Sequence, residues 1–225
     1  MDVQWVRAGV TNTYLIRERG AVLVDAGEPG KGPTVLHKLA KLVEGAGKPA
    51  LIVATHGHFD HIGAAADLRA ATGAKVAIHA GDADLLAHGT VAMPPGVTRW
   101  GRLSADVVLK PLYMPRLRIT PLAPDIVLGD EEFSLAPFGV AGTVLHTPGH
   151  SPGSVTVLLE SGEAFVGDCA MNGFPFCRRP SLPIYADDVA VLTQSWRRLL
   201  ARNVTTIYPA HGRPFPAAAM TALLA

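Results

Sequence analysis

The sequence is short of several features that mark particular classes of protein. It holds two cysteines in 225 residues, which excludes the disulfide framework of a small secreted domain and suggests a reducing compartment. Charged residues make up only 17% of the chain and sum to a net charge of +1, with no dense basic run. The overall charge therefore favours neither nucleic acid nor an anionic membrane as a partner.

Long hydrophobic runs are also missing. No uninterrupted apolar stretch reaches the roughly 20 residues of a membrane-spanning helix, and the first residues lack the basic and apolar regions of a signal peptide. We therefore expect a cytoplasmic location and no stable membrane insertion. Apolar residues make up 48% of the chain, which is enough to form the core of one domain covering residues 1–225.

Short β-branched runs alternate with segments rich in alanine and leucine, a pattern typical of an α/β fold. Strands are expected at residues 3–6, 13–17, 21–25, 51–54, 75–79, 144–146, 154–159, 164–166 and 205–208. Helices are expected at residues 33–44, 62–71, 82–87 and 187–201. The side chains of the last helix expected to face the core are Val191, Trp196, Leu199 and Leu200.

Residues 93–124 are rich in proline and break this alternation. A surface loop with a short helix would explain the composition. The alternative is an insertion that covers the active site as a lid or forms the contact of a homodimer.

Four polar side chains crowd onto one short loop after the strand expected at residues 51–54. That loop reads His56-Gly57-His58-Phe59-Asp60-His61. The end of a strand is where open α/β sheets place their ligands. Imidazole and carboxylate groups together favour zinc, iron or manganese over calcium or magnesium. A loop this short cannot easily wrap four donors around one ion, but it can face two ions.

Three later donors each follow an apolar run, namely His150 in a Pro/Gly turn, Asp168 and His211. Alone, each would more often be an ordinary loop, turn or cap residue. The clustered loop has no structural rationale, because it gathers several costly polar groups in one place. Together these positions predict a two-metal centre built from His56, His58, Asp60, His61, His150, Asp168 and His211.

The clustered loop resembles the His-x-His-x-Asp-His signature of the metallo-β-lactamase-fold superfamily of metallo-hydrolases, and the later donors match that family in order. The resemblance implies an αββα sandwich with the site along one edge between two sheets. It implies that a first metal is held by His56, His58 and His150. A second metal would be held by Asp60, His61 and His211, and Asp168 would bridge the two. Asp25, in an early Asp-x-Gly turn, matches a position that supports a ligand.

The resemblance also implies a reaction. Two divalent ions, zinc in the first place with iron or manganese as alternatives, would lower the pKa of a shared water so that a bridging hydroxide attacks the substrate. Asp60 is expected to take up and return the proton. The expected substrate is a small ester, thioester or lactone, as in the glyoxalase II-like thioesterases and the lactonases of the superfamily. Asp168 argues against antibiotic hydrolysis, and the neutral charge balance argues against the nuclease branches.

A second class of enzyme remains open. Persulfide dioxygenases resemble the same fold and signature but use a single iron held by two histidines and the aspartate. A nuclease or a non-catalytic metal-binding protein is the remaining alternative. Elemental analysis would separate a two-metal hydrolase from a one-iron dioxygenase.

Other residues invite weaker interpretations. An apolar substrate pocket is suggested by Met93, Trp100, Met114, Phe174 and Phe176, and residues 172–183 are suggested as substrate contacts. The candidates for a tyrosine near the site are Tyr14, Tyr113 and Tyr185. Structural roles are expected for Cys169, His79 and His146.

Overall fold

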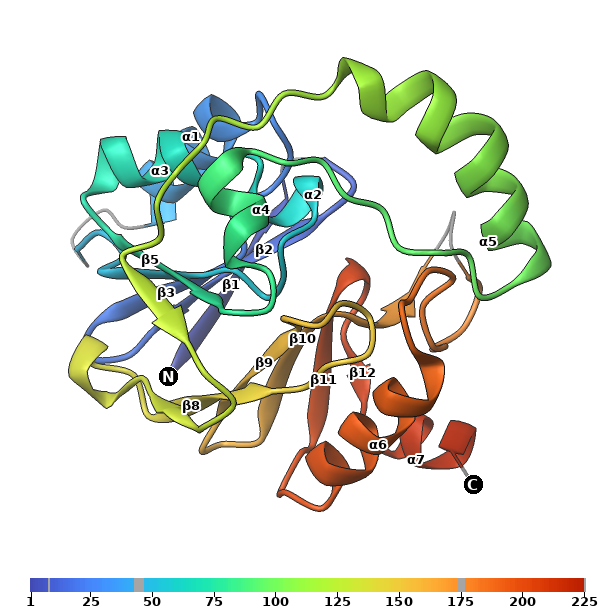
Figure 1. Ribbon diagram of the computed structural model, residues 1–225. Helices are drawn as coiled ribbons and strands as arrows, with labels where there is room; N and C mark the ends of the chain where they lie inside the picture. Colours follow the sequence, from blue (N-terminus) through green and yellow to red (C-terminus); the bar gives the residue numbers. More distant parts are fainter. Residues whose placement is uncertain (8, 43–46, 174–176, 225) are drawn as a thin grey trace.

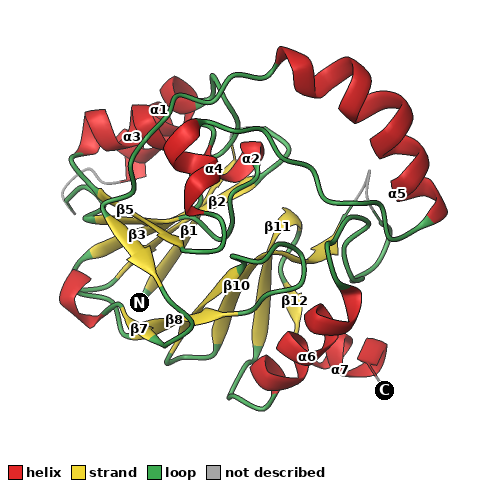
Figure 2. Cartoon of the chain, in the orientation of Figure 1, coloured by secondary structure: helices red, strands yellow, loops and turns green. Residues whose placement is uncertain are grey.

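Two six-stranded β-sheets lie face to face in the computed structural model, which describes residues 1–7, 9–42, 47–173 and 177–224 (Figure 1). Helices cover the outer faces of the two sheets (Figure 2). The layers are therefore helix, sheet, sheet and helix, which confirms the expected αββα sandwich. None of the helices in the described part of the chain is long and apolar enough to cross a lipid bilayer.

The first sheet is mixed. Its strands, in spatial order, are β1 (Asp2–Arg7), β2 (Asn12–Arg17), β3 (Ala21–Val24), β4 (Leu51–Val53), β5 (Lys75–His79) and β6 (Ile126–Leu128). The first three pair antiparallel as a meander, and β3 to β6 pair parallel. Parallel neighbours place their carboxyl ends at the same edge of the sheet, so the loops after β4 and β5 lie side by side there.

The second sheet is also mixed. Its strands, in spatial order, are β12 (Phe215–Pro216), β11 (Thr206–Gly212), β10 (Glu163–Asn172), β9 (Val155–Leu159), β8 (Gly142–His146) and β7 (Phe133–Ser134). Only β10 and β11 pair parallel, with register shifts between Phe165 and Gly167 and between Gly167 and Met171. These irregularities bend β10 where it passes the edge of the sandwich.

The helices belong to two groups and one separate segment. The first sheet is accompanied by α1 (Gly32–Leu42), α2 (Phe59–Ile62), α3 (Ala65–Thr72) and α4 (Ala83–His88). The second sheet is covered by α6 (Val189–Leu200) and α7 (Ala218–Leu224). Between them stands a continuous helical segment made of α5 (Arg99–Ser104), a π-helix (Ala105–Tyr113) and a 3₁₀ turn (Met114–Arg116), which arches over one end of the molecule (Figure 1).

The core has three layers because strand side chains alternate between the two faces of a sheet. On the first sheet, Leu23 and Ile52 point to a cluster shared with α1 and α3, whereas Val22 and Leu51 point to a cluster between the sheets. A third cluster lies between the second sheet and α6 and α7, with Trp196 fully buried at its centre.

Most expected elements are present, and the exceptions are instructive. The expected strand at 164–166 is much longer, so Asp168 lies inside β10 rather than at its end. The expected helix at 62–71 is split into α2 and α3 at Gly63 and Ala64. In α6 the buried side chains are Leu192, Ser195, Trp196 and Leu199, and Leu200 is partly buried against the same cluster. Val191 does not belong to that cluster and was wrongly assigned to the core. Residues 43–44 of the first expected helix lie outside the described residues.

Candidate metal centre

The structure brings all seven predicted donors together at one edge of the sandwich. They come from the loop after β4, from α2, from the loop after β8, and from β10 and β11, so both sheets contribute. Each of the seven is at most 7% exposed, and His61 is completely buried. Burying so many ionisable groups is costly unless they are paired or coordinate a cation.

Three histidines form what we call the first donor set, namely His56, His58 and His150. The Nε2 atom of His150 lies 3.2 Å from Nε2 of His56 and 3.0 Å from Nδ1 of His58. The Nδ1 atom of His150 lies 2.9 Å from the carbonyl oxygen of Tyr185 and can only donate to it, which leaves a lone pair on Nε2. The carbonyl of Tyr185 therefore orients His150 with its free nitrogen toward the other two rings.

The second donor set consists of Asp60, His61 and His211. The Oδ2 atom of Asp60 lies 3.2 Å from Nε2 of His211 and 3.6 Å from Nε2 of His61. The hydroxyl of Thr11 donates to the same oxygen at 2.7 Å. Thr11 was not predicted, because it lies 49 residues from Asp60 in a segment without any motif.

Asp168 lies between the two donor sets. Its Oδ1 atom is 3.4 Å from Nε2 of His61 and 3.3 Å from Nε2 of His211. Its Oδ2 atom is 3.7 Å from Nε2 of His150. One carboxylate oxygen thus faces each set, which is the arrangement a bridging ligand needs.

Two orphaned atoms show that the donors suit a cation. Nδ1 of His61 donates to Oδ2 of Asp25 at 2.9 Å, so Nε2 of the neutral ring carries a lone pair. That Nε2 and Oδ1 of Asp168 are buried and have no hydrogen-bond partner among the described residues. A lone pair facing a carboxylate is repulsive unless a proton or a cation lies between them. The imidazole and carboxylate donors are the ones that zinc, iron and manganese accept.

Burial keeps the first donor set neutral. It lowers the pKa of His58 to about 3, with the neighbouring His150 adding to the effect. The pKa of His56 also lies well below its usual value, because the ring is buried and His61, His58 and His150 surround it. Neutral imidazoles present the lone pairs that a metal ion requires, so this set needs no deprotonation at neutral pH.

The second donor set has the opposite electrostatics in the metal-free protein. Burial alone would lower the pKa of His211, but Asp168 and Asp60 outweigh it and raise the pKa to about 10. The same carboxylates and Asp25 raise the pKa of His61 well above its usual value. Burial would raise the pKa of Asp60, but His61 and His211 lower it overall. Protons here occupy the positions that a divalent cation would take.

A second layer of side chains holds the donors. Asp25 accepts from the backbone N–H and hydroxyl of Thr55 at 2.8 and 2.9 Å while it receives the Nδ1–H of His61. Its own backbone has a φ of 62°, a left-handed conformation that aspartate tolerates better than most residues. The expected supporting position of Asp25 is therefore occupied by a side chain in contact with His61.

Asp82 connects the two ligand-bearing loops and was not singled out in the sequence. Its Oδ2 accepts from the N–H of Gly57 and the hydroxyl of Ser151, both at 2.7 Å. Its Oδ1 accepts from the N–H of Gly153 at 2.9 Å. Asp82 is 2% exposed and lies just before α4, so the loop after β5 fixes the loops that carry His58 and His150.

An apolar cavity of about 300 Å³ opens beside the donors. Besides His58, Asp60, His150, Asp168 and His211, its walls include Phe59, Met93, Pro94, Val108, Leu109, Tyr113, Met171 and Tyr185. Met93, Tyr113 and Tyr185 were anticipated near the site, whereas Trp100 and Met114 do not line the cavity. Tyr14 instead donates its hydroxyl to the carbonyl of Pro209 at 2.8 Å. Phe174 and Phe176 lie outside the described residues.

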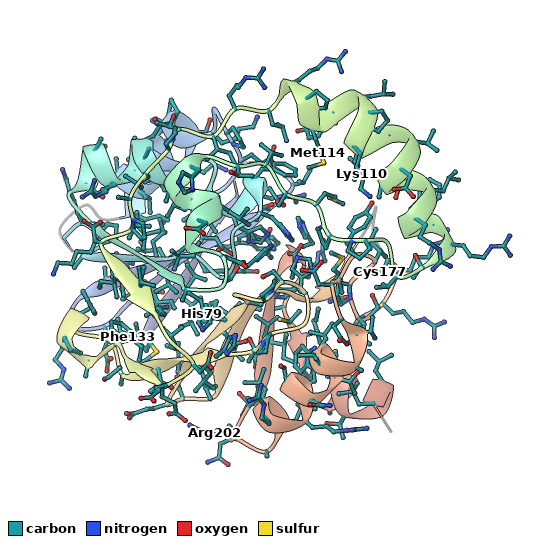
Figure 3. The ribbon with its side chains drawn as sticks, in the orientation of Figure 1. His79, Lys110, Met114, Phe133, Cys177 and Arg202 are labelled. Atoms are coloured by element: carbon teal, nitrogen blue, oxygen red, sulfur yellow. The ribbon has the colours of Figure 1, made fainter. Side chains whose placement is uncertain are left out.

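A separate cluster joins His79, labelled in Figure 3, with His146 and Asp130. The two rings stack with centroids 3.9 Å apart, and Asp130 Oδ1 lies 3.2 Å from Nε2 of His79 and 2.8 Å from Nδ1 of His146. The N–H of Gly81 donates to Nδ1 of His79, so the neutral ring carries its proton on Nε2 and points that proton at Asp130. This polarity opposes metal ligation by His79 and agrees with the structural role expected for both histidines.

Comparisons with known proteins agree with this fold. The chain belongs to the metallo-beta-lactamase superfamily, whose family model matches residues 6–211. It is therefore a member of a superfamily of metallo-hydrolases. The seven buried side chains at one edge of its sandwich form the candidate metal centre.

Two curated relatives are similar over most of this chain. A "Probable metallo-hydrolase YqgX" of Bacillus subtilis is 30% identical over 162 residues, which is 71% of this chain and 65% of that protein. A "Hydroxyacylglutathione hydrolase" of Anaeromyxobacter dehalogenans is 31% identical over 208 residues, which is 91% of this chain and 62% of that protein. The chain thus spans less than two thirds of the length of these relatives.

Solved structures give the same fold. The structure of TTHA1623 in a di-iron-bound form is 30% identical, with a TM-score of 0.64, and the match covers 94% of this chain and 92% of that one. The BLEG-1 B3 metallo-beta-lactamase has a TM-score of 0.70 over 98% of this chain and 97% of that one. Its identity of 23% supports the fold alone.

Proposed function

We propose that this protein is a hydrolase that uses two divalent metal ions to cleave a small ester, thioester or lactone. The observation that carries the proposal is the pair of buried donor sets, joined by Asp168 and opening onto an apolar cavity. The resemblance of this chain to a structure described as di-iron-bound, and to hydroxyacylglutathione hydrolases, supports both the metal count and the bond type.

The residues of the chain divide the work in this proposal. The first donor set, His56, His58 and His150, would hold one ion, and the second set, Asp60, His61 and His211, would hold the other. When bound, the ions supply a water that deprotonates near neutral pH and an electrophile for the carbonyl oxygen. Asp168 fixes the spacing between the two sets through its two oxygens.

Asp60 is the proposed proton carrier. Thr11 occupies its Oδ2, which leaves Oδ1 to take a proton from the attacking water and pass it to the leaving group. Its carboxylate forms part of the cavity wall, where a substrate would lie.

The cavity determines which substrates fit. Its lining is mostly apolar, with Phe59, Val108, Leu109 and Met171 around the polar donors. We propose that an apolar acyl group or lactone ring occupies this space and excludes water from the reacting carbonyl. The segment that contains Val108 and Leu109 belongs to the proline-rich insertion, which in this proposal acts as the cover of the active site.

The test compares hydrolysis of thioester, lactone and carboxylic ester panels by the purified protein and by two variants. Asp168→Ala should lower kcat/KM by more than the roughly 10–100-fold that loss of a supporting side chain costs at a metal site. Asp84→Ala, an exposed carboxylate on α4, should retain full activity. Equal activity of Asp168→Ala and the unmodified protein would refute the two-metal hydrolase, and oxygen uptake with a persulfide would point to the dioxygenase instead.

A further inference from the structure

The helical segment over the cavity exposes an unusual amount of apolar surface. We define its apolar ridge as Trp100, Leu103, Val107, Val108, Leu112 and Tyr113. Trp100 is 61% exposed, Val107 is 56% exposed, and Leu103 and Leu112 are each 55% exposed. Soluble proteins rarely expose apolar side chains in one contiguous group, and such a group usually marks an interaction surface.

The ridge is exposed although the segment is firmly anchored on its other face. Ala105 is completely buried in a cluster with Met171, Ile184 and Tyr185. A Cβ added at the buried Gly101 would lie 2.3 Å from the carbonyl oxygen of Ile184, so helix and loop are in close contact. The segment therefore has a definite inward face, and Val108 and Tyr113 at the cavity adjoin it. The side chains of Trp100, Leu103, Val107 and Leu112 remain more than half exposed.

Cations surround the ridge. Residues 99–118 carry five cations and one acid, a net charge of +4 in a chain whose total is +1. Among the described residues, the only ion pair of this segment joins Asp106 to Lys110, labelled in Figure 3, at 2.9 Å. The cations without an acidic partner in that part of the chain are Arg99, Arg102, Arg116 and Arg118. The low net charge of the sequence thus conceals a strongly basic patch.

We propose that the apolar ridge and its arginines form a docking surface for an anionic lipid bilayer. A helix with tryptophan and aliphatic side chains on one face and cations beside them is suited to lie in the headgroup region of a membrane. The arginines would meet the negative headgroups while the ridge enters the acyl boundary. The overall charge did not favour such a partner, because it averages this patch with an acidic remainder.

Charge also argues against a second copy as the occupant. A symmetric dimer through the ridge would place the same patch of each protomer against itself. The four arginines would then face their equivalents, and Asp106, the one acid of residues 99–118, is already paired with Lys110. An anionic surface removes that repulsion, whereas a twofold contact creates it.

The ridge lies beside the cavity, so docking at the ridge would bring the cavity close to the membrane. Val108 and Tyr113 belong to the ridge and also line the cavity beside the donors. The docked face would therefore adjoin the mouth of the cavity. A lipophilic molecule dissolved in the bilayer could reach the cavity without crossing bulk water.

The experiment measures cosedimentation of the intact protein with vesicles of pure phosphatidylcholine and with vesicles that also contain phosphatidylserine. Binding is expected with the anionic vesicles only, and it should weaken as salt is added. Each of Arg99→Gln and Arg102→Gln should weaken binding about five-fold. The double variant Trp100→Ser/Leu103→Ser should weaken it roughly ten-fold or more.

Matched controls use the same substitutions elsewhere. Val127→Ser and Leu223→Ser remove exposed apolar side chains distant in sequence from the ridge, and Arg19→Gln removes an exposed arginine at the turn after β2. These variants should bind vesicles as the unmodified protein does. Absence of vesicle binding, or equal loss in the controls, would overturn the proposal. A concentration-dependent dimer in sedimentation velocity that Trp100→Ser/Leu103→Ser abolishes would also overturn it, in favour of self-association.

Discussion

Three of the donor side chains at the candidate site are hydrogen-bonded to a second residue that supports them. His61 contacts Asp25, His150 contacts the carbonyl of Tyr185, and Asp60 contacts Thr11, each at 2.7–2.9 Å. Such contacts fix which nitrogen or oxygen of each donor is free, and they typically matter to metal affinity nearly as much as the ligands themselves. Metal affinity should therefore depend on these supporting side chains and on the protons that the donors carry.

Asp82→Asn should weaken metal binding by the first donor set, although Asp82 is not a member of that set. An amide keeps the size of the side chain but offers one acceptor where Asp82 now accepts from Gly57, Ser151 and Gly153. We expect a loss of about 1–3 kcal/mol in unfolding free energy, and metal affinity should fall roughly 10–100-fold. Chemical denaturation and equilibrium dialysis against a metal buffer measure the two effects. Asp84→Asn is the control, and equal behaviour of the two variants would contradict this role.

Metal loading should release protons from the second donor set. In the metal-free protein the pKa of His211 is raised to about 10, so at neutral pH this ring carries a proton that an incoming cation must displace. The apparent affinity of that set should therefore rise as pH rises toward 10. The first donor set is already neutral, since the pKa of His58 is about 3, and should bind with little proton release.

Calorimetric titration of the metal-free protein in two buffers of different ionisation enthalpy checks this prediction. The second binding step should release roughly one proton per displaced imidazolium. A binding enthalpy that is the same in both buffers for both steps would contradict the assigned electrostatics.

At this scale the sequence predicted all seven donors now found together, because three histidines and an aspartate within six positions have no structural explanation. It could not predict Thr11, Asp82 or Tyr185 as supports. Their contacts join residues that are distant in sequence, such as Ser151 and Asp82, and none of them belongs to a recognisable motif.

Secondary-structure elements position the donors through close contacts between loops and helices. The turn that carries His150 lies against the start of α6, where Asp188 caps the helix by accepting from the N–H groups of Ala190 and Val191. Asp188 also donates its own N–H to the carbonyl of Gly149. The first donor set therefore depends on how this turn packs against α6.

Gly149→Ala should expose that dependence. Gly149 has a φ of 130°, and an added Cβ would lie 2.3 Å from the backbone nitrogen of Leu192 in α6. Gly73 has a φ of 77° with nothing within 4 Å of the added Cβ, so Gly73→Ala should cost only the left-handed strain of about 1–2 kcal/mol. The overlap in Gly149→Ala should cost a further 1–3 kcal/mol or so. Thermal unfolding compares the two variants. An equal loss of stability in both would show that the turn at Gly149 does not pack against α6.

The elements that were missed are the helix α7 and three short strands. The strands β6, β7 and β12 have two or three residues each, too few for an alternating pattern to register. The segment 99–113 is helical although it contains Pro111, and its second part, Ala105–Tyr113, is a π-helix. The expectation of a short helix in a loop captured its presence but not its length.

The two sheets of the molecule meet at the candidate site, because each sheet contributes donors to it. His56 and His61 follow the first sheet, whereas Asp168 and His211 lie in strands of the second. The two sheets also share a buried apolar cluster that includes Val22, Leu51 and Phe165. A bound cation at the donors would therefore stabilise the association of the two halves.

Metal ions should raise the thermal stability of the whole chain. A ligand that binds only the folded state at about 100 times its dissociation constant adds about 2.7 kcal/mol of stability. Zinc or manganese added to the chelator-treated protein should raise the Tm, and calcium, which prefers oxygen ligands, should not. Asp168→Ala should reduce the shift. Equal shifts with calcium and zinc would contradict binding at these imidazole-rich sets.

At the scale of the molecule, the α/β alternation predicted the class of fold, and the resemblance of the His56–His61 loop to a superfamily signature supplied the αββα arrangement. Composition did not predict the distribution of charge, since a net +1 includes a segment of +4. The charge of this segment can be counted from the sequence, but the exposure of the apolar side chains beside its arginines comes from the structure.

The most direct measurement is the metal content of the protein, purified without chelators or a metal-binding tag and analysed by elemental mass spectrometry. The two donor sets predict about two divalent ions per chain, with a fall toward one or none in Asp168→Ala and no change in Asp84→Ala. A single iron per chain, unaffected by loss of His211, would contradict the two-metal hydrolase. The absence of any bound metal would contradict the metal centre itself.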